Sequence, residues 1–368
     1  MKIGEFFKEN TLLCDGAMGT YYASKFHDET LVERENFEHP ERIAQIHGEY
    51  LESGARLLRT NTFATNSNFF SSVEEMENNI MIACQIAKSA VEAYYEKTGL
   101  TKETYPVYVA ADIGTIYDME QKDDSNVLAE YHHIVDTFVS AGMDIFWLET
   151  QVDVYYLKRL LAYIKEKAPQ AYVMVSFSMD KTAYSKGGLQ FDRMVRLMSE
   201  MDEVNAYGLN CGMEAAHMYQ LLKNVTFPSE KPVIALPNAG YPYQLRGKTI
   251  YGKNESYFQK MVLQIADLGI DLVGGCCGTT PDYLKEIAEQ LKGKKKIEKK
   301  TGSPETPAVS RTESVFWKKL QSGEKPFVVE LDPPSDIKVE KLVSGAQLLK
   351  EHRVDLLTLS DSPMARSR

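Results

Sequence analysis

Short apolar runs alternate with longer amphipathic segments from the N-terminus to about residue 291. Eight of these runs have the length and composition of strands buried on both faces. Between them, apolar residues recur every three or four positions, as at Tyr257, Met261, Ile265 and Leu268, which is the spacing of a helix face. The predicted strands are Thr11–Asp15, Arg56–Thr60, Val107–Asp112, Asp144–Glu149, Tyr172–Phe177, Tyr207–Cys211, Pro232–Pro237 and Leu272–Cys276.

Eight strand–helix repeats predict an α/β fold, and more specifically a (β/α)8 TIM barrel with parallel strands. An open, doubly wound sheet is the alternative that the same alternation allows. Such sheets usually have fewer strands in a segment of this length, so the pattern favours the barrel. We expect the barrel to span residues 1–291.

The composition changes after Leu291. Residues 292–314 are rich in Lys, Glu, Pro, Ser and Thr and almost lack apolar residues, which predicts a linker. The elements expected beyond it are helices at Val315–Leu320 and Val339–His352 and strands at Phe327–Leu331 and Asp355–Leu359. One strand–helix–strand unit cannot bury its own faces. We therefore expect residues 315–368 to be the truncated start of a second α/β barrel.

Charge and composition narrow the classes of function. The chain has 42 basic and 52 acidic residues and a net charge of −10, which argues against nucleic acid as a partner. No apolar run reaches the roughly 18–20 residues of a membrane span, and the charged segment Met1–Asn10 lacks the features of a secretory signal. Five cysteines in 368 residues do not make a disulfide scaffold. We expect a cytoplasmic protein whose clustered cysteines serve a metal or catalysis.

Three cysteines follow predicted strands. Cys211 ends the sixth strand, and Cys276 and Cys277 end the eighth. Because reactive groups gather at the carboxyl ends of barrel strands, the three thiolates are expected to converge there. Three protein ligands and one open position are the arrangement of a catalytic zinc. The alternative is that they are ordinary small buried residues, as we expect for Cys14 and Cys84.

Zinc would give such a site a defined chemistry. A free thiol has a pKa near about 8.5 and is mostly protonated at neutral pH. Coordination removes that proton and holds the sulfur in place. A thiolate can displace an activated methyl group in line, so the sequence predicts methyl transfer to a thiol substrate.

Several short motifs resemble those of the homocysteine S-methyltransferase family. The resemblance covers roughly residues 1–291 and keeps the order and spacing of the motifs. They are Asp15–Thr20, Asn61–Phe63, Glu149–Thr150, Asn210–Gly212 and Gly274–Gly278. The resemblance implies a zinc-dependent barrel that methylates homocysteine to methionine, with Cys211, Cys276 and Cys277 as the zinc ligands and catalytic residues.

The resemblance also implies a pocket for homocysteine. Asp15 and Glu149 match family positions for binding the ammonium group. The backbone N–H groups of Ala17, Met18 and Gly19 are expected to bind the carboxylate. Considered alone, Asp15 could belong to an ordinary turn, and Glu149 could pair with a lysine.

Three asparagines lie at or just after the ends of predicted strands and either orient the substrate or brace loops. They are Asn61, Asn210 and Asn238. We place Asn210 among the substrate-binding residues, whereas bracing is favoured for Asn238, which follows Pro237.

The last part of the chain carries a second, shorter resemblance. Phe327–Pro334 resembles the first strand of methylenetetrahydrofolate reductase, an FAD-dependent barrel, and Asp355–Asp361 resembles its second strand. Glu330 matches a catalytic glutamate of that family. The order implies the N-terminal portion of a bifunctional homocysteine S-methyltransferase and methylenetetrahydrofolate reductase. The residues that hold FAD are expected beyond Arg368, so reductase activity is expected only of the full-length protein.

The sequence leaves the methyl donor open. S-methylmethionine or a betaine-like donor has a good leaving group, whereas methyltetrahydrofolate must release its methyl from a tertiary amine. Fusion to a reductase nevertheless favours the folate. Two other functions also remain: an oxidoreductase whose N-terminal barrel is accessory, and a zinc- or thiol-binding module without turnover.

Overall fold

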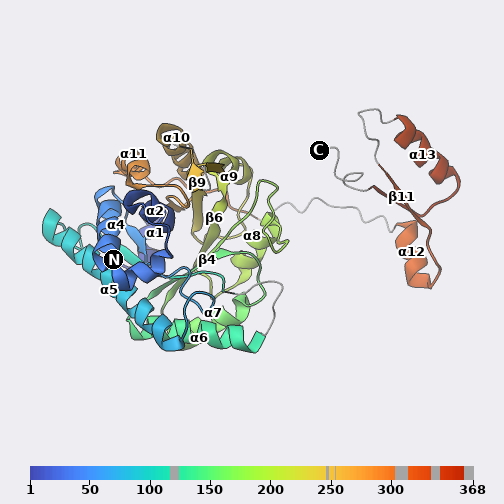
Figure 1. Ribbon diagram of the computed structural model, residues 1–368. Coiled ribbons are helices and arrows are strands. Elements are labelled where there is room, and N and C mark those ends of the chain that lie inside the picture. The colour runs from blue at the N-terminus through green and yellow to red at the C-terminus, as the bar shows by residue number, and fades with distance from the viewer. Residues whose placement is uncertain (117–123, 246–247, 253, 303–313, 333–339, 360–368) are drawn as a thin grey trace. The chain divides into compact units, whose positions relative to one another are not determined.

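The computed structural model describes residues 1–116, 124–245, 248–252, 254–302, 314–332 and 340–359. It divides into two compact units, Met1–Pro304 and Glu305–Arg368 (Figure 1). The first unit carries the barrel and all five cysteines.

Eight parallel strands form one sheet in the order β1-β10-β7-β6-β5-β4-β3-β2. A parallel bridge between Cys14 and Leu57 joins the two ends of this sheet. The predicted barrel is therefore confirmed, and the open sheet is rejected. Each strand overlaps its predicted run: β1 Leu12–Leu13, β2 Leu57–Arg59, β3 Tyr108–Ile113, β4 Ile145–Gln151, β5 Tyr172–Phe177, β6 Ala206–Glu214, β7 Val233–Asn238 and β10 Leu272–Val273.

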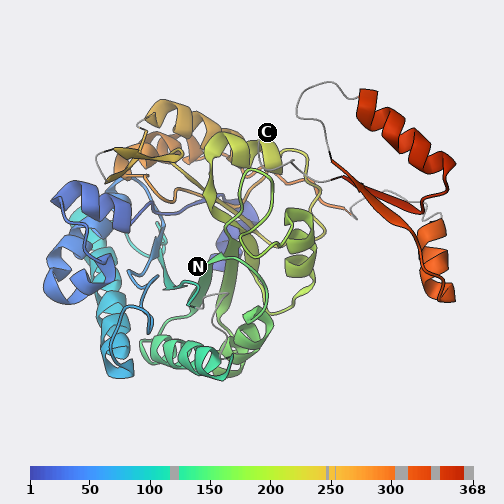
Figure 2. The same cartoon turned by 45° about the vertical axis from the view of Figure 1, so that its right-hand side comes forward.

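Helices surround the strands (Figures 1 and 2). Buried apolar side chains on their inner faces form the main core with the outward side chains of the strands. None of the helices in the described ranges has the length and apolar character to cross a membrane. The helices that follow the barrel strands are α4 Pro40–Glu52, α5 Val73–Thr98, α6 Asp124–Ser140, α7 Leu157–Lys167, α8 Phe191–Glu200, α9 Ala215–Leu222, α10 Glu255–Ala266 and α11 Pro281–Leu291.

The first unit has several elements that the apolar pattern did not predict. Helix α1 packs Ile3, Phe6 and Phe7 against the inner apolar side chains of the barrel. Three short helices lie between β1 and α4, and a hairpin follows β7. These elements are α1 Ile3–Glu9, α2 Gly19–Phe26, η1 Val32–Arg34, α3 Glu35–Glu38, β8 Pro242–Leu245 and β9 Lys248–Tyr251.

Side chains that point to the barrel axis change from apolar to polar along six of the strands, β2 to β7. Strand side chains alternate between two faces. On β4, Ile145 and Trp147 belong to the inner apolar cluster, and Glu149 is the next inward position. On β3, Asp112 follows Tyr108 and Ala110 in the same way. The polar layer at the carboxyl ends consists of Arg59, Asp112, Glu149, Ser176, Asn210 and Asn238, all buried.

The segment after α11 differs from the linker predicted over 292–314. Lys296 and Lys299 both pair with Asp271, which is fully buried before β10. The backbone of Phe227 then pairs with that of Thr301 in a parallel bridge. Composition alone suggested an unpacked segment, because its apolar residues are few. The lysine–aspartate pairs and the backbone bridge instead attach it to the barrel as far as residue 302. Residues 303–313 lie outside the described ranges.

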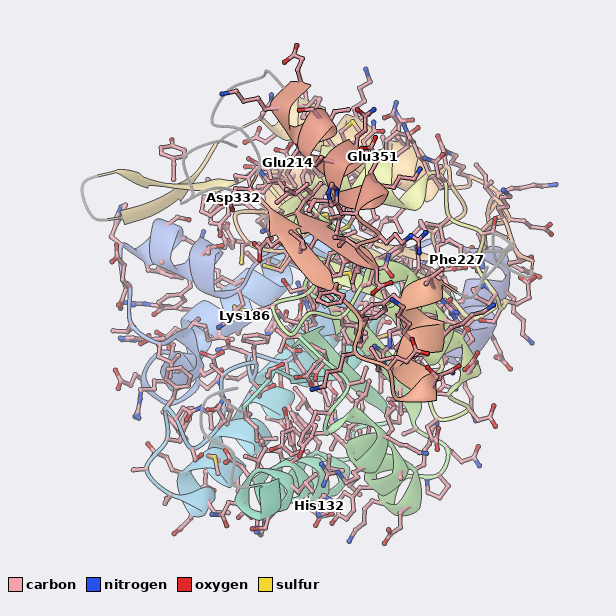
Figure 3. All side chains as sticks on the ribbon, turned by 90° about the vertical axis from the view of Figure 1, so that its right-hand side faces the viewer. His132, Lys186, Glu214, Phe227, Asp332 and Glu351 are labelled. Atoms are coloured by element: carbon pink, nitrogen blue, oxygen red, sulfur yellow. The ribbon has the colours of Figure 1, made fainter. Side chains whose placement is uncertain are left out.

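The second unit contains one strand–helix–strand unit with a preceding helix. Its elements are α12 Val315–Ser322, β11 Val328–Leu331, α13 Glu340–Glu351 and β12 Leu356–Leu359. The two strands pair in parallel, and Figure 3 shows Asp332 after β11 and Glu351 at the end of α13. Glu330 lies on β11 and is exposed. No described residue of this unit is buried. The predicted Pro333–Pro334 and Ser360–Asp361 fall outside the described residues.

We expect Asp271→Asn to destabilise the barrel by about 3 kcal/mol, because it leaves Lys299 buried, at 8% exposure, without its anionic partner. The free energy of unfolding, measured by urea denaturation, tests this.

Asp267→Asn is the matched control, because it removes the partner of Lys294 in an ion pair that is largely exposed. This change should cost less than about 1 kcal/mol. Equal losses in the two variants would show that the Asp271 pairs do not hold the segment to the barrel.

Candidate metal centre and substrate pocket

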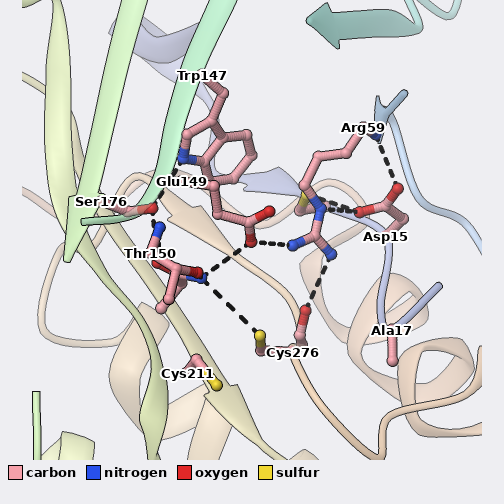
Figure 4. A network of polar contacts seen from close by, with 12 residues as sticks. Asp15, Ala17, Arg59, Trp147, Glu149, Thr150, Ser176, Cys211 and Cys276 are labelled. Atoms are coloured by element: carbon pink, nitrogen blue, oxygen red, sulfur yellow. Dashed lines mark hydrogen bonds and ion pairs between the residues drawn. The ribbon is translucent and has the colours of Figure 1, made fainter. Parts of the chain in front are cut away.

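The sulfur atoms of Cys211, Cys276 and Cys277 all lie within 4.8 Å of one another. Figure 4 shows two of the three, Cys211 and Cys276. The Sγ atoms of Cys211 and Cys277 are 3.8 Å apart. Tetrahedral zinc with bonds of about 2.3 Å places its sulfur ligands about 3.8 Å apart. The predicted convergence of the three cysteines is therefore present, and its geometry fits a zinc ion.

A break in strand alternation brings Cys211 to this site. Asn210 points inward, so a regular strand would turn Cys211 outward. Instead, Cys211 has a left-handed backbone with φ of 58°, and the pairing of β6 with β7 shifts register after Asn210. Gly212 continues the left-handed turn with φ of 71°, and a Cβ there would lie 2.2 Å from the carbonyl oxygen of Met179. The glycine thus makes this turn possible.

Cys276 and Cys277 lie in a tight turn after β10. The N–H of Cys276 donates to Pro237 O at 2.8 Å, and the N–H of Ala239 donates to Cys277 O at 2.9 Å. The hydroxyl of Thr279 donates to Cys276 O at 2.6 Å. Because both cysteines are fixed by backbone hydrogen bonds, their sulfurs are positioned by the barrel rim.

The pKa values of the three thiols shift in opposite directions. Hydrogen bonds from Cys276 and Cys277 lower the pKa of Cys211 to about 3. Hydrogen bonding with Cys211 raises the pKa of Cys276, and it raises that of Cys277 to about 12. The cluster by itself thus favours one thiolate and two thiols, so a cation that binds all three sulfurs must displace protons.

A buried guanidinium stands between the two carboxylates that were predicted to bind the substrate ammonium (Figure 4). Arg59 Nε donates to Asp15 Oδ1 at 2.8 Å, and Arg59 Nη1 donates to Glu149 Oε1. Its Nη2 donates to Gly16 O at 2.6 Å. Burial lowers the pKa of Arg59, but the charges of Asp15 and Glu149 outweigh burial and raise it well above its ordinary value. Arg59 therefore stays charged.

Asn210 connects the carboxylates to the cysteines. Its Nδ2 donates to Glu149 Oε1 at 2.9 Å and lies 3.9 Å from Cys276 Sγ. Its Oδ1 accepts hydrogen bonds from Thr150 N at 3.0 Å and from Ser176 Oγ at 2.8 Å. With both ends of the amide engaged, Asn210 has one fixed orientation.

Asp112 lies beside Glu149 in the same polar layer. It is 4% exposed, and within the described residues its Oδ1 has no hydrogen-bond partner. Burial raises the pKa of Asp112 well above its ordinary value, and the charge of Glu149 raises it further. The contact with Glu149 therefore favours the neutral, protonated form of Asp112.

The other predicted residues lie as follows. The N–H of Ala17 donates to Thr279 O at 3.3 Å and to Thr279 Oγ1 at 3.2 Å. Met18 caps α2 and Gly19 begins it, so their N–H groups are at the amino end of a helix, where the dipole favours anions.

Of the remaining asparagines and cysteines, one lies at the site, one braces a loop and two belong to the apolar core. The side chain of Asn61 donates to Val32 O at 2.8 Å and braces a loop. Asn238 lies beside Cys211, and a hydrogen bond between them lowers the thiol pKa. Cys14 and Cys84 are buried in the two apolar clusters, as predicted.

Sequence reasoning missed Arg59 and Asp112. Both stand at the carboxyl end of an apolar run, at an inward position two residues after a buried one, Leu57 and Ala110 respectively. A charged residue at such a position is the signal that could have identified them.

Comparisons with known proteins agree with this geometry. A family model described as homocysteine S-methyltransferase matches residues 12–291. Homocysteine S-methyltransferase 1 of Arabidopsis thaliana is 26% identical over 277 residues, which is 69% of this chain and 84% of that protein. Homocysteine S-methyltransferase YbgG of Bacillus subtilis is 26% identical over 298 residues, which is 75% of this chain and 93% of that protein.

The fold has relatives among solved structures. The metallated form of the homocysteine methyltransferase MmuM from Escherichia coli aligns with a TM-score of 0.61 and 21% identity. The alignment covers 78% of this chain and 99% of that one. At this identity the match supports the barrel fold.

We expect serine at position 211, 276 or 277 to lower the zinc content from about one ion per chain to a small fraction, because each sulfur supplies one of three ligands. Zinc affinity should also fall as the pH falls, since protons compete for Cys276 and Cys277. Metal analysis of the purified variants tests the first expectation, and competition with a chromogenic chelator across pH tests the second.

Cys84→Ser is the matched control, because Cys84 is a core residue on α5. It should keep a full complement of zinc. Unchanged zinc in the three site variants would refute the assignment of these ligands.

Proposed function

Because the chain belongs to the homocysteine S-methyltransferase family, we propose that it holds zinc through Cys211, Cys276 and Cys277 and methylates homocysteine to methionine. The family assignment makes the chain a methyltransferase. The observation that carries the proposal is the convergence of three sulfurs, within 4.8 Å, beside a buried carboxylate cluster.

The chain's residues have separate tasks in this proposal. The three cysteines would hold the zinc ion beside the sulfur of the substrate. Zinc bound there supplies the positive charge that stabilises a thiolate at neutral pH. Glu149 contributes negative charge for the substrate ammonium, and Asn210 fixes Glu149 relative to Cys276. The first turn of α2, at Met18 and Gly19, offers N–H groups for the carboxylate.

Methyl transfer is a single displacement at carbon. The thiol first loses its proton to solvent, and a lone pair of the resulting thiolate then forms the bond to the methyl carbon. The bond from that carbon to the donor heteroatom breaks, and the donor keeps the electron pair. The products are methionine and the demethylated donor, with no change in the protein's covalent structure.

The second unit supports a more specific proposal. We infer that it begins a methylenetetrahydrofolate reductase barrel with Glu330 as a catalytic residue and FAD as the cofactor of the full-length reductase domain. Its parallel β11–β12 pair has the topology of the first two strands of such a barrel. Its exposed Trp317, Phe327 and Leu348 need further protein surface to cover them. Such a fusion would make methyltetrahydrofolate available close to its consumer.

The cysteines also indicate in which cellular compartment the protein works. The site needs three reduced thiols, and all five cysteines of the chain are free. We therefore place the protein in a reducing compartment such as the cytoplasm.

We expect the zinc-loaded chain to form methionine from homocysteine and at least one of three donors: S-methylmethionine, betaine and methyltetrahydrofolate. Methionine is measured by mass spectrometry with isotopically labelled donor methyl groups. Cys276→Ser should lower the rate by more than about 100-fold, because even changing a group that only orients a metal ligand costs about 10- to 100-fold.

Two controls make the result specific. A chelator should abolish turnover and added zinc should restore it, while Cys84→Ser should retain activity. If none of the donors yields labelled methionine, the chain does not have the proposed activity.

A further inference from the structure

The hairpin that follows β7 is attached to the cysteine turn at both of its ends. Before β8, the N–H of Ala239 donates to Cys277 O at 2.9 Å. At the end of β9, the ring of Tyr251 lies against Gly278, where an added Cβ would be 2.4 Å from Cγ of the ring. The hairpin therefore returns directly to the turn that carries two of the three sulfurs.

The hydroxyl of Tyr251 faces the sulfur cluster and is hydrogen-bonded to Sγ of Cys277. Burial raises the pKa of Tyr251 above its ordinary value, and the charges of Cys277, Cys211 and Cys276 raise it further. A phenol carries one proton and has an ordinary pKa of about 10. At neutral pH the hydroxyl is therefore the donor and the sulfur is the acceptor.

The other two sulfurs have donors of their own. Asn210 Nδ2 lies 3.9 Å from Cys276 Sγ, and the backbone N–H of Gly212 donates to Cys211. Tyr251 differs from these donors because it lies on the hairpin and not on a barrel strand. Its hydroxyl can therefore be removed without a change in the strands that position the cysteines.

Zinc ligation leaves a chemical problem that such donors address. In the proposed function, three protein sulfurs and the substrate sulfur lie together within reach of one methyl donor. A thiolate is a nucleophile, so a methyl group passed to a protein cysteine would inactivate the site. A hydrogen bond that stabilises a thiolate also weakens it as a nucleophile. The donor to Cys277 thus favours the thiolate that a metal needs and protects it from the methyl group.

We propose that Tyr251 is a positioning residue of the metal centre, which holds the sulfur of Cys277 in place as a ligand and makes it a poorer methyl acceptor than the substrate. The inference rests on the proposed function, because it assumes that Cys277 is a zinc ligand. It gives the hairpin a task in directing the methyl group to the thiol of the substrate.

The first test measures methylation of Cys277 in the full chain with zinc in excess and no substrate. Methyl iodide is the probe: its carbon forms a bond to the thiolate sulfur, and iodide leaves with the electron pair of the carbon–iodine bond. Fragment-ion mass spectrometry of the digested protein gives the rate at each cysteine. Tyr251→Phe should raise the rate at Cys277 by roughly tenfold, because the sulfur loses a hydrogen bond to its charged form.

Cobalt in place of zinc gives a readout that needs no reaction. Loss of the hydrogen bond raises the energy of the sulfur lone pairs, so the thiolate-to-cobalt charge-transfer band should move to longer wavelength in Tyr251→Phe. Zinc affinity should fall by about tenfold, at the low end of the range for groups that orient metal ligands. Tyr243→Phe is the matched control, because it removes the hydroxyl of an exposed tyrosine on the same hairpin. It should behave as wild type in all three measurements.

The outcomes separate the two proposals. If wild type binds no zinc, the proposed function fails and this inference fails with it. If wild type binds zinc but Tyr251→Phe leaves the methylation rate at Cys277 unchanged, only the inference is overturned. A crystal structure of zinc-loaded wild type needs no variant: the hydroxyl of Tyr251 should lie within hydrogen-bond distance of Cys277 Sγ. A hydroxyl that points away from this sulfur there would overturn the inference in the same way.

Discussion

The closed barrel imposes one constraint from which the site follows: every second side chain of eight strands must share the same narrow interior. The lower positions of this interior are filled by apolar residues and closed by α1. At the carboxyl ends the same positions carry charged and amide groups. These groups are buried because the ring of strands is closed, so each needs a partner from a neighbouring strand or from a ligand.

Arg59 shows how the chain supplies partners for these buried polar groups. One guanidinium compensates carboxylates on two other segments, Asp15 after β1 and Glu149 on β4, and also binds the carbonyl of Gly16. Its burial would be unfavourable without them, and their burial would be unfavourable without it. The arrangement fixes the rim on which the cysteines stand, while its net charge stays negative. The site is thus organised before any substrate arrives, and its charge favours a cationic group.

Much of this organisation could be predicted from the sequence, and the parts that could not have identifiable reasons. The barrel follows from local periodicity, and the three cysteines follow from their positions after strands six and eight. The pairing of Arg59 could not be predicted, because the choice among several buried acids depends on side-chain geometry across strands far apart in sequence. The inward turn of Cys211 depends on a left-handed residue within β6, which strict alternation does not indicate. The attachment of residues 294–302 was missed because it depends on two lysines and one buried aspartate, where composition indicated only a polar segment.

That attachment has a practical consequence for work on the isolated barrel. A family boundary drawn at Leu291 looks natural, since α11 ends there. A barrel cut at that residue would keep Asp271 in its interior but lose both of its lysines and the strand bridge at Phe227. Low yield or aggregation of such a fragment would then reflect an unneutralised acid at the base of the barrel rather than a defect of the metal site. Ending the fragment after Gly302 would avoid this confusion, because the fragment would then retain both lysine–aspartate pairs and the strand bridge.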